Sequence, residues 1–126
     1  MNNTVLETFA PLEQDKDLNN MSVMCRVTAF DTSFIFPGDA SISEMNDFYN
    51  RGTDFSCNVM AAAHHGSDES LHKKFLIRCN PDIVVYSCGE DNSYGHPHKE
   101  VVDFFNKLGC KSYRTDIVGS VLFTCD

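Results

Sequence analysis

Two short apolar runs, each followed by a helix-like stretch, constrain the fold of this chain most. The runs are "NVMAAA" at 58–63 and "DIVVYSC" at 82–88. A short apolar run bounded by turn signals is typical of a buried strand. Residues 67–78 and 97–109 follow with apolar side chains at helical spacing. The sequence therefore predicts an α/β fold, in which covering helices are layered on a sheet.

The first part of the chain predicts a pair of strands and then a helix. Alternation in "SVMCRVTAF" at 22–30 and the apolar "SFIF" at 33–36 indicate strands joined by a turn at 31–32. Ser41 and Glu44 then form a capping-box pattern, which is typical of a helix start.

The last part of the chain predicts two further strands. They lie around "KSYRT" at 111–115 and "SVLFTC" at 120–125, on either side of a turn at 116–119. The expected order of elements is β-β-α-β-α-β-α-β-β.

Composition limits the classes of protein to which the chain can belong. With 126 residues, 42% of them hydrophobic, residues 1–126 are expected to form a single domain. The net charge of −8 argues against broad affinity for nucleic acid or anionic lipid, although a local patch can still bind a short phosphate-bearing ligand. No apolar stretch reaches the roughly 18 residues of a membrane span, and residues 1–14 do not resemble a signal peptide, so a cytoplasmic location is expected. Six cysteines without a CxxC pair predict reduced thiols in the core.

Three loops carry the residues with chemical potential. Imidazole and carboxylate together suit zinc, manganese or iron, and a two-metal site needs a bridging carboxylate. Gly66 allows close approach of the backbone, and a helix beginning near Ser67 favours an anion. The loops are "PGDA" with Asp39, "HHGS" with His64 and His65, and "NSYGHPH" with Asn92, Tyr94, His96 and His98.

Each of these residues also has a purely structural interpretation, and the residues alone leave the choice open. Asp39 can be a turn residue or a helix cap, and a histidine pair is often part of a polar surface. His96 can cap the helix that begins near Pro97. His72 is expected on a solvated helix face and is given no role.

The combined pattern resembles a known family. The segments "NNMSVMCRV", "FIFPGDA", "AAAHHGS", "NPDIVVYSCGEDNSYGHPHKEV" and "LGCKSYRTDIVGSV" occur in the same order in the metallo-β-lactamase-fold domain of ComEC-type competence proteins. The resemblance runs from about Val5 to Cys125. It implies half of an αββα sandwich with a two-metal site, which hydrolyses phosphodiesters or related esters, DNA included, with a metal-activated water.

The resemblance also assigns roles to individual residues. Asp39 matches the aspartate that bridges the two metals, and His64 matches the metal-binding histidine that comes late in the family's sequence. His65 is expected to lie beside the metal or to touch the substrate. The reverse assignment of His64 and His65 stays open. His96 is expected to contact phosphate or donate a proton. Three further residues are expected to bind the substrate: Ser67, Asn92 and Tyr94. Two asparagines, Asn19 and Asn20, stand where many enzymes of this fold have another histidine ligand.

One departure from the family pattern is decisive. The main metal motif, HxHxDH, is missing, and no histidine precedes His64, so the chain resembles only the C-terminal half of the domain. Such a half exposes an apolar sheet face, which a partner chain or self-association would cover. It would hold zinc or manganese weakly and would need the missing half for hydrolysis of a phosphate-bearing substrate. The alternatives are a catalytically inactive binding or dimerisation module, and a protein whose histidines are only hydrogen-bonded.

Overall fold

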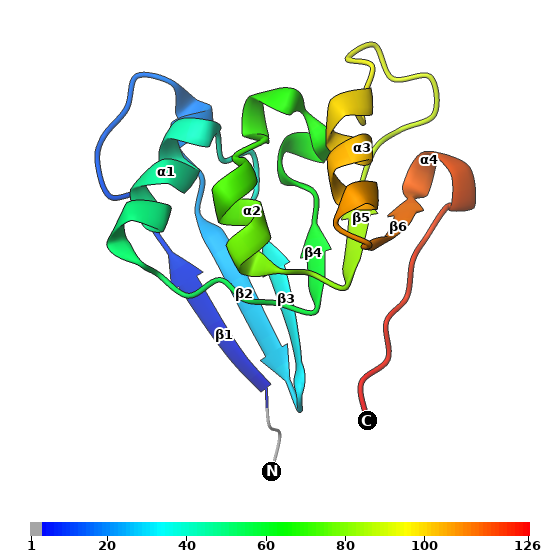
Figure 1. Cartoon of the computed structure of the whole chain (residues 1–126), viewed down its shortest axis with the longest axis horizontal. Coiled ribbons are helices and arrows are strands. Elements are labelled where there is room, and N and C mark those ends of the chain that lie inside the picture. The colour runs from blue at the N-terminus through cyan, green and yellow to red at the C-terminus, as the bar shows by residue number, and fades with distance from the viewer. Residues whose placement is uncertain (1–3) are drawn as a thin grey trace.

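One six-stranded sheet organises the chain (Figure 1). The computed structural model describes residues 4–126. Strand order in the sheet follows the sequence; the first three strands are antiparallel, and the third to the sixth are parallel. The strands are β1 (Thr4–Phe9), β2 (Met24–Ala29), β3 (Thr32–Phe36), β4 (Val59–Ala61), β5 (Ile83–Tyr86) and β6 (Lys111–Arg114).

Helices connect the parallel strands and lie on one face of the sheet (Figure 1). They are α1 (Ile42–Arg51), α2 (Lys73–Cys79) and α3 (Lys99–Lys107), and a short helix, α4 (Thr115–Val118), follows β6 directly. Three 3₁₀ turns complete the structure: η1 (Leu18–Met21), η2 (Ala63–Gly66) and η3 (Asp68–Ser70). The predicted α/β fold is confirmed.

The hydrophobic core lies between the sheet and these helices. Alternate side chains of the strands point into it, because successive residues of a strand face opposite sides. Fully buried strand residues meet large helix residues there: Met24, Ile35, Met60, Val84 and Tyr86 from the sheet, and Met45, Phe48, Phe75, Leu76, Val101 and Phe105 from the helices.

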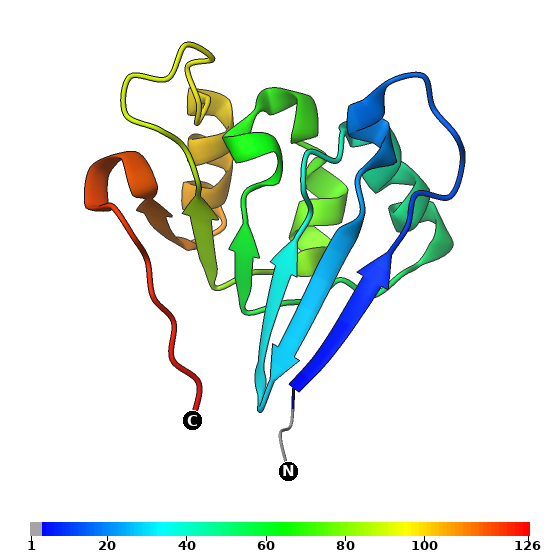
Figure 2. The same cartoon turned by 180° about the vertical axis from the view of Figure 1, so that it is seen from behind.

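The opposite face of the sheet is also apolar, but no helix among residues 4–126 covers it (Figure 2). The last residues of the chain, 119–126, run beside this face, and the ring of Phe123 meets that of Phe34 edge-on at 5.7 Å. A groove of about 630 Å³ lies between them, lined by Val27, Phe34, Phe36, Val59, Ala61, Val85, Val121, Phe123 and Cys125, among others. We call these sheet residues and the groove the open face.

Three elements differ from the prediction, and one residue has a different role. Residues 120–125 form no strand, because no neighbouring strand lies within hydrogen-bonding reach. β1 was not predicted, although "TVLETF" alternates as an edge strand does. The predicted 67–78 helix is instead η3 followed by α2. His72 caps α2 by accepting a hydrogen bond from the Phe75 N–H at 3.0 Å, so it is not a solvated mid-helix residue.

Smaller differences concern turns and cysteines. The β2–β3 turn lies at Phe30 and Asp31, one residue earlier than expected. All six cysteines are free, as predicted, but only Cys57 and Cys79 are buried in the core. No helix within residues 4–126 is long and apolar enough to cross a bilayer. The segment 1–14, which does not resemble a signal peptide, includes residues 1–3, and these lie outside the described residues.

The predicted capping box at the start of α1 is half formed. Ser41 accepts a hydrogen bond from the Ser43 N–H at 3.2 Å, as a cap does. Glu44 does not form the second bond of the box, which would be to the backbone N–H of Ser41. Its side chain is 4% exposed, and neither carboxylate oxygen has a partner of normal hydrogen-bond geometry among the described residues. Burial raises the pKa of Glu44 to about 7, and Asp47 adds to the rise while the Ser22 amide opposes it.

Glu44 predicts a pH dependence of stability. Its pKa is higher in the folded than in the unfolded protein, so the folded state is favoured while Glu44 is protonated, and this contribution is lost as pH rises from about 4.5 to about 7. We expect the free energy of unfolding to fall by about 1–3 kcal/mol over this range. Glu44→Gln should remove most of this loss in urea titrations at several pH values; an unchanged pH profile in the variant would contradict it.

The open face predicts binding of hydrophobic dyes. Phe36 is 46% exposed there, so Phe36→Lys should reduce the fluorescence of an added naphthalene-sulfonate dye while changing the free energy of unfolding by less than about 1 kcal/mol. Leu18→Lys is the matched control, because Leu18 is 82% exposed in η1, away from this face. Equal dye binding by both variants would show that the dye binds elsewhere.

Candidate functional site

The loops after β3, β4 and β5 meet at one edge of the sheet (Figure 1). Because these strands are parallel, their carboxyl ends lie at the same edge. Asp39 follows β3, His64 and His65 follow β4, and the loop 87–98 follows β5. A backbone hydrogen bond joins the first two loops, since the His64 N–H donates to the Gly38 carbonyl at 2.9 Å. The predicted convergence of the loops is confirmed.

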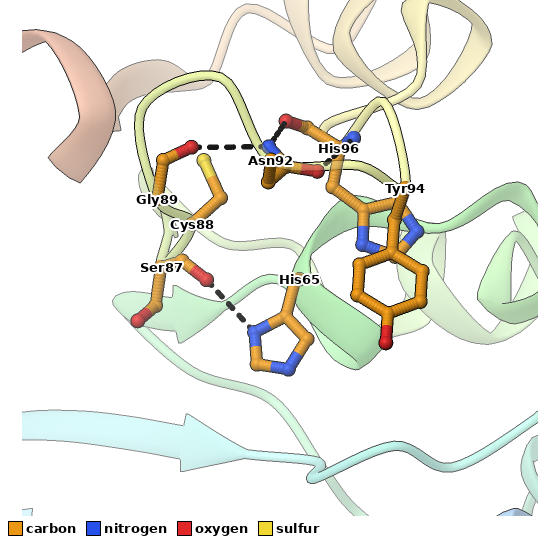
Figure 3. Close-up of a pocket in the computed structure, with 7 residues that line it drawn as sticks. All are labelled: His65, Ser87, Cys88, Gly89, Asn92, Tyr94 and His96. Carbon is orange, nitrogen blue, oxygen red and sulfur yellow. Dashed lines mark hydrogen bonds between the residues drawn. The ribbon is translucent and has the colours of Figure 1, made fainter.

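Asp39 and His65 face each other across this edge. Oδ1 of Asp39 lies 3.8 Å from Nε2 of His65. On the other side of the ring, Nδ1 of His65 lies 2.8 Å from the Ser87 carbonyl oxygen (Figure 3). A carbonyl can only accept a hydrogen bond, so Nδ1 carries the proton and Nε2 of the neutral ring keeps its lone pair. The unprotonated Nε2 is therefore the ring atom that lies near the Asp39 carboxylate.

This geometry suits a shared cation better than a direct hydrogen bond. A separation of 3.8 Å is too long for a hydrogen bond. Zinc lies about 2.0–2.2 Å from a nitrogen or oxygen ligand, so two ligand atoms of a tetrahedral zinc are about 3.3–3.6 Å apart, slightly closer than these two atoms. Histidine ligands commonly donate their second N–H to a carbonyl, as His65 does to Ser87. Both side chains are about half exposed, so a cation can reach them from solvent.

The backbone decides which histidine faces Asp39. His64 and His65 both have left-handed φ values, 48° and 58°, which are uncommon for residues other than glycine. The imidazole of His64 lies against Glu69, with 3.8 Å between Nδ1 and Oε2, and its side chain is only 19% exposed. The structure thus brings Asp39 together with His65 rather than with His64, which favours the reverse of the first assignment. The role of His64 as a metal ligand stays a prediction.

The loop 87–98 is closed by Asn92. Its amide nitrogen donates to the carbonyls of Gly89 at 3.1 Å and His96 at 2.7 Å, and its oxygen accepts from the His96 N–H at 2.9 Å (Figure 3). Asn92 therefore holds the loop through all of these bonds, an arrangement that does not favour the predicted contact with substrate.

Aromatic rings line the cavity between this loop and His65. Tyr94 lies nearly parallel to His96, with centroids 5.6 Å apart and an angle of 18°, and His96 lies over His65 at 6.2 Å and 25°. The cavity has a volume of about 300 Å³ and is also lined by Ser87, Cys88, Gly89 and Asn92 (Figure 3). The three rings therefore line the same cavity, and Asp39 lies next to one of them, His65.

Two histidines of this loop differ in their electrostatics. Burial lowers the pKa of His96, and the neighbouring His98, His64 and His65 lower it further, so His96 is neutral near pH 7. Burial also acts to lower the pKa of His98, but hydrogen bonds to the Tyr94 carbonyl and the Asp68 carboxylate outweigh burial and raise it. Sequence reasoning gave His98 no role, and the signal available was its place two residues after His96.

Three other residues singled out in the sequence have structural contacts. Ser67 is 3% exposed and accepts a hydrogen bond from the Glu69 N–H at 3.3 Å, so its burial argues against the predicted contact with substrate. Asn20 donates to Asp15 at 2.9 Å and accepts from Ser41. The Asn19 N–H donates to Asp17 at 2.9 Å. Both asparagines hold the segment before β2.

Residues 4–126 do not form a complete metal centre. Within residues 4–126, no group of three or more His, Cys, Asp or Glu side chains is placed to hold a metal ion. Asp39 and His65 provide two candidate ligand atoms, whereas a catalytic zinc has three protein ligands as a rule.

Comparison with known proteins relates the chain to competence proteins. No protein-family model matches it. Over 119 residues it is 28% identical to ComE operon protein 3 of Bacillus subtilis and 31% identical to competence protein ComA of Neisseria gonorrhoeae, which covers 94% and 93% of this chain. It is 26% identical to recombination protein 2 of Haemophilus influenzae over 103 residues, or 82% of this chain. The matched regions are 15%, 17% and 13% of these relatives, so the chain spans only a small part of their length.

Gly66 connects the histidine loop to the loop 87–98 and should not tolerate a side chain. A Cβ at this position would lie 2.7 Å from Cβ of Pro97 and 2.9 Å from a ring carbon of Tyr86, and its φ is +87°. We expect Gly66→Ala to lower the free energy of unfolding by about 2–4 kcal/mol.

Gly95→Ala provides the matched control for this prediction. It also has a positive φ, +72°, but a Cβ there has no neighbour within 4 Å, so it should cost only about 1 kcal/mol. Urea unfolding followed by circular dichroism measures both, and equal losses would show that the contact with Pro97 is unimportant.

Proposed function

We propose that this chain is one part of a metal-dependent hydrolase of phosphodiesters or related esters, with a role connected to competence. The observation that carries the proposal is the pair formed by Asp39 Oδ1 and His65 Nε2, 3.8 Å apart, with the histidine fixed by the Ser87 carbonyl. The names of the relatives support the connection to competence. The resemblance to the metallo-β-lactamase fold supports the class of reaction.

The residues have distinct roles in this proposal. Asp39 and His65 would hold zinc or manganese, which when bound would supply a Lewis acid and lower the pKa of water. His96 lies between His65 and Tyr94, and because its pKa is lowered, its neutral imidazole can act as a general base that accepts a proton from the attacking water. Tyr94 borders the cavity and contacts the substrate.

The rest of the centre comes from another segment of polypeptide. Two ligand atoms hold a cation weakly, so a segment with an HxHxDH motif supplies the others. The same segment, or a second sheet attached to it, covers the open face, whose strand residues Val27, Phe34 and Val85 would otherwise remain partly in contact with solvent. The isolated chain is therefore expected to retain little metal and to show little or no turnover.

We propose DNA as the source of the substrate, because two relatives are named as a competence protein and a recombination protein. The net charge of −8 opposes attraction of a long duplex, so we propose a short or single-stranded phosphodiester as the substrate.

A second candidate function is an inactive binding or dimerisation module derived from the same fold. The open face favours it, because this surface suits a protein partner, and a group of three metal ligands is not formed within residues 4–126. Turnover distinguishes the candidates. Mixing the chain with a polypeptide that carries HxHxDH should yield hydrolysis of bis(4-nitrophenyl) phosphate if the first is correct, and binding without hydrolysis if the second is correct.

Metal binding tests the proposed ligands. Titration calorimetry with Mn²⁺ and Zn²⁺ should give weak binding by the wild type, reduced about 10-fold or more in Asp39→Asn and in His65→Asn. His64→Asn should bind within about 2-fold of the wild type, because its imidazole lies against Glu69. Asp31→Asn, in the turn at the opposite end of β3, is the control for the loss of a charge. If Asp39→Asn binds as tightly as the Asp31→Asn control, the proposed pair is not the metal site.

A further inference from the structure

A second cavity lies between the first turns of α1 and the segment 10–20, which Figure 1 shows beside that helix. Its volume is about 180 Å³, below the roughly 300–1,000 Å³ of pockets for drug-sized ligands. We call it the acidic cavity, because four of its nine lining residues are acidic and none is basic. The lining residues are Pro11, Leu12, Glu13, Gln14, Asp15, Asn20, Ser43, Glu44 and Asp47.

Glu44 is the unusual residue of the acidic cavity. It is 4% exposed, and neither of its carboxylate oxygens has a hydrogen-bond partner of normal geometry among residues 4–126. A glutamate is almost never buried to this degree unless it is paired, because an unpaired charge loses its hydration on burial. An unpartnered buried group of this kind indicates an ion or ligand that is still to be bound.

The surroundings of Glu44 attract a cation. Burial raises the pKa of Glu44 to about 7; the Ser22 amide lowers it, and the charge of Asp47 raises it further. Within residues 4–126, no Lys, Arg or His nitrogen lies within 4.0 Å of any of the four carboxylates of the acidic cavity. A bound cation would relieve both the burial of Glu44 and its repulsion by Asp47.

Hydrogen bonds hold the wall of the acidic cavity in place. Asp15 accepts from the Asp17 N–H at 2.8 Å and from the side-chain amide of Asn20 at 2.9 Å. The oxygen of that amide accepts from Ser41, which caps α1. The segment before η1 is thereby tied to the start of α1, so the acidic cavity is formed before a ligand binds, and less conformational freedom is lost on binding.

The arrangement of acceptors selects the kind of cation. A metal ion needs several ligands around one point, and no group of three or more His, Cys, Asp or Glu side chains in the described part of the chain is placed to hold one. A guanidinium has five N–H donors in a planar fork and bonds to both oxygens of one carboxylate. It is also more weakly hydrated than an ammonium, which suits a buried ion pair. The two unpartnered oxygens of Glu44 therefore favour a guanidinium.

The lining also indicates the source of this guanidinium. Free arginine carries a carboxylate, which the acidic cavity would repel, since none of its lining residues is a cation. An arginine inside a polypeptide carries no such carboxylate. The volume of about 180 Å³ suits a single side chain of a polypeptide that binds from outside.

We infer that the acidic cavity binds the guanidinium of an arginine side chain from a partner polypeptide, which forms a bidentate ion pair with Glu44. Asp15 and Asp47 add attraction from the wall of the cavity. The site is separate from the Asp39–His65 pair and does not depend on the proposed function.

Amide NMR of the labelled chain tests this site with a probe that represents an arginine in a polypeptide. At about pH 7.5 and low salt, N-acetyl-arginine amide should shift the signals of residues 11–20 and 43–47, because Glu44 is mostly ionised there. The neutral analogue N-acetyl-citrulline amide should not shift them. N-acetyl-lysine amide and free arginine should each bind about 3-fold or more weakly than N-acetyl-arginine amide.

Variants identify the carboxylate that carries the binding. Glu44→Gln should bind N-acetyl-arginine amide about 10-fold or more weakly than the wild type, because it removes a buried charge-assisted pair. Glu100→Gln removes the same charge from an exposed position on α3 and should bind within about 2-fold of the wild type. Circular dichroism checks that both variants are folded.

Several outcomes would overturn the inference. Equal affinity of Glu44→Gln and the wild type, equal shifts with the citrulline probe, or no shift with any probe would show that Glu44 holds no guanidinium. Tighter binding of the lysine probe would reject the bidentate pair. Free arginine that binds as tightly as the amide would reject a polypeptide as the source and favour a small metabolite.

Discussion

The parallel pairing of β3, β4 and β5 is the constraint on which the rest of the structure depends. Pairing of Ile35 with Met60, and of Met60 with Val84, brings the carboxyl ends of these strands to one edge. The loops that carry Asp39 and His65 must then meet, and the hydrogen bond between the His64 amide and the Gly38 carbonyl fixes their distance. A slip of register by one residue would turn every side chain of the slipped strand to the opposite face of the sheet and separate the loops.

The two faces of the sheet are both apolar, but they differ in how much of each is covered by other parts of the chain. Helices bury the central strands on one face, whereas the other face meets, within residues 4–126, the last residues of the chain through contacts such as Phe34 with Phe123. The candidate site shows a related incompleteness, because Asp39 and His65 provide two ligand atoms where a catalytic metal needs more. A single additional segment of polypeptide would complete both, which links the open face to the proposed chemistry.

Sequence reasoning predicted where the candidate site lies better than it predicted the contacts within it. Apolar runs and turn signals located the strands, and strand ends in an α/β fold are where sites lie, so Asp39, His65 and His96 could be found. The resemblance assigned Ser67 and Asn92 to substrate binding, because both lie in loops beside the expected site. In the structure those groups are used by the Glu69 amide and by the backbone of the 87–98 loop.

The sequence by itself determined the α/β class, the strands that deliver the loops and the acidic charge that limits the ligands, because these depend on local patterns of side chains. Only the tertiary structure decided that His65 rather than His64 faces Asp39, since two successive left-handed residues set the direction of each ring. It also decided that residues 120–125 form no strand. Strand propensity is local, but a strand exists only where a neighbouring chain segment satisfies its backbone hydrogen bonds.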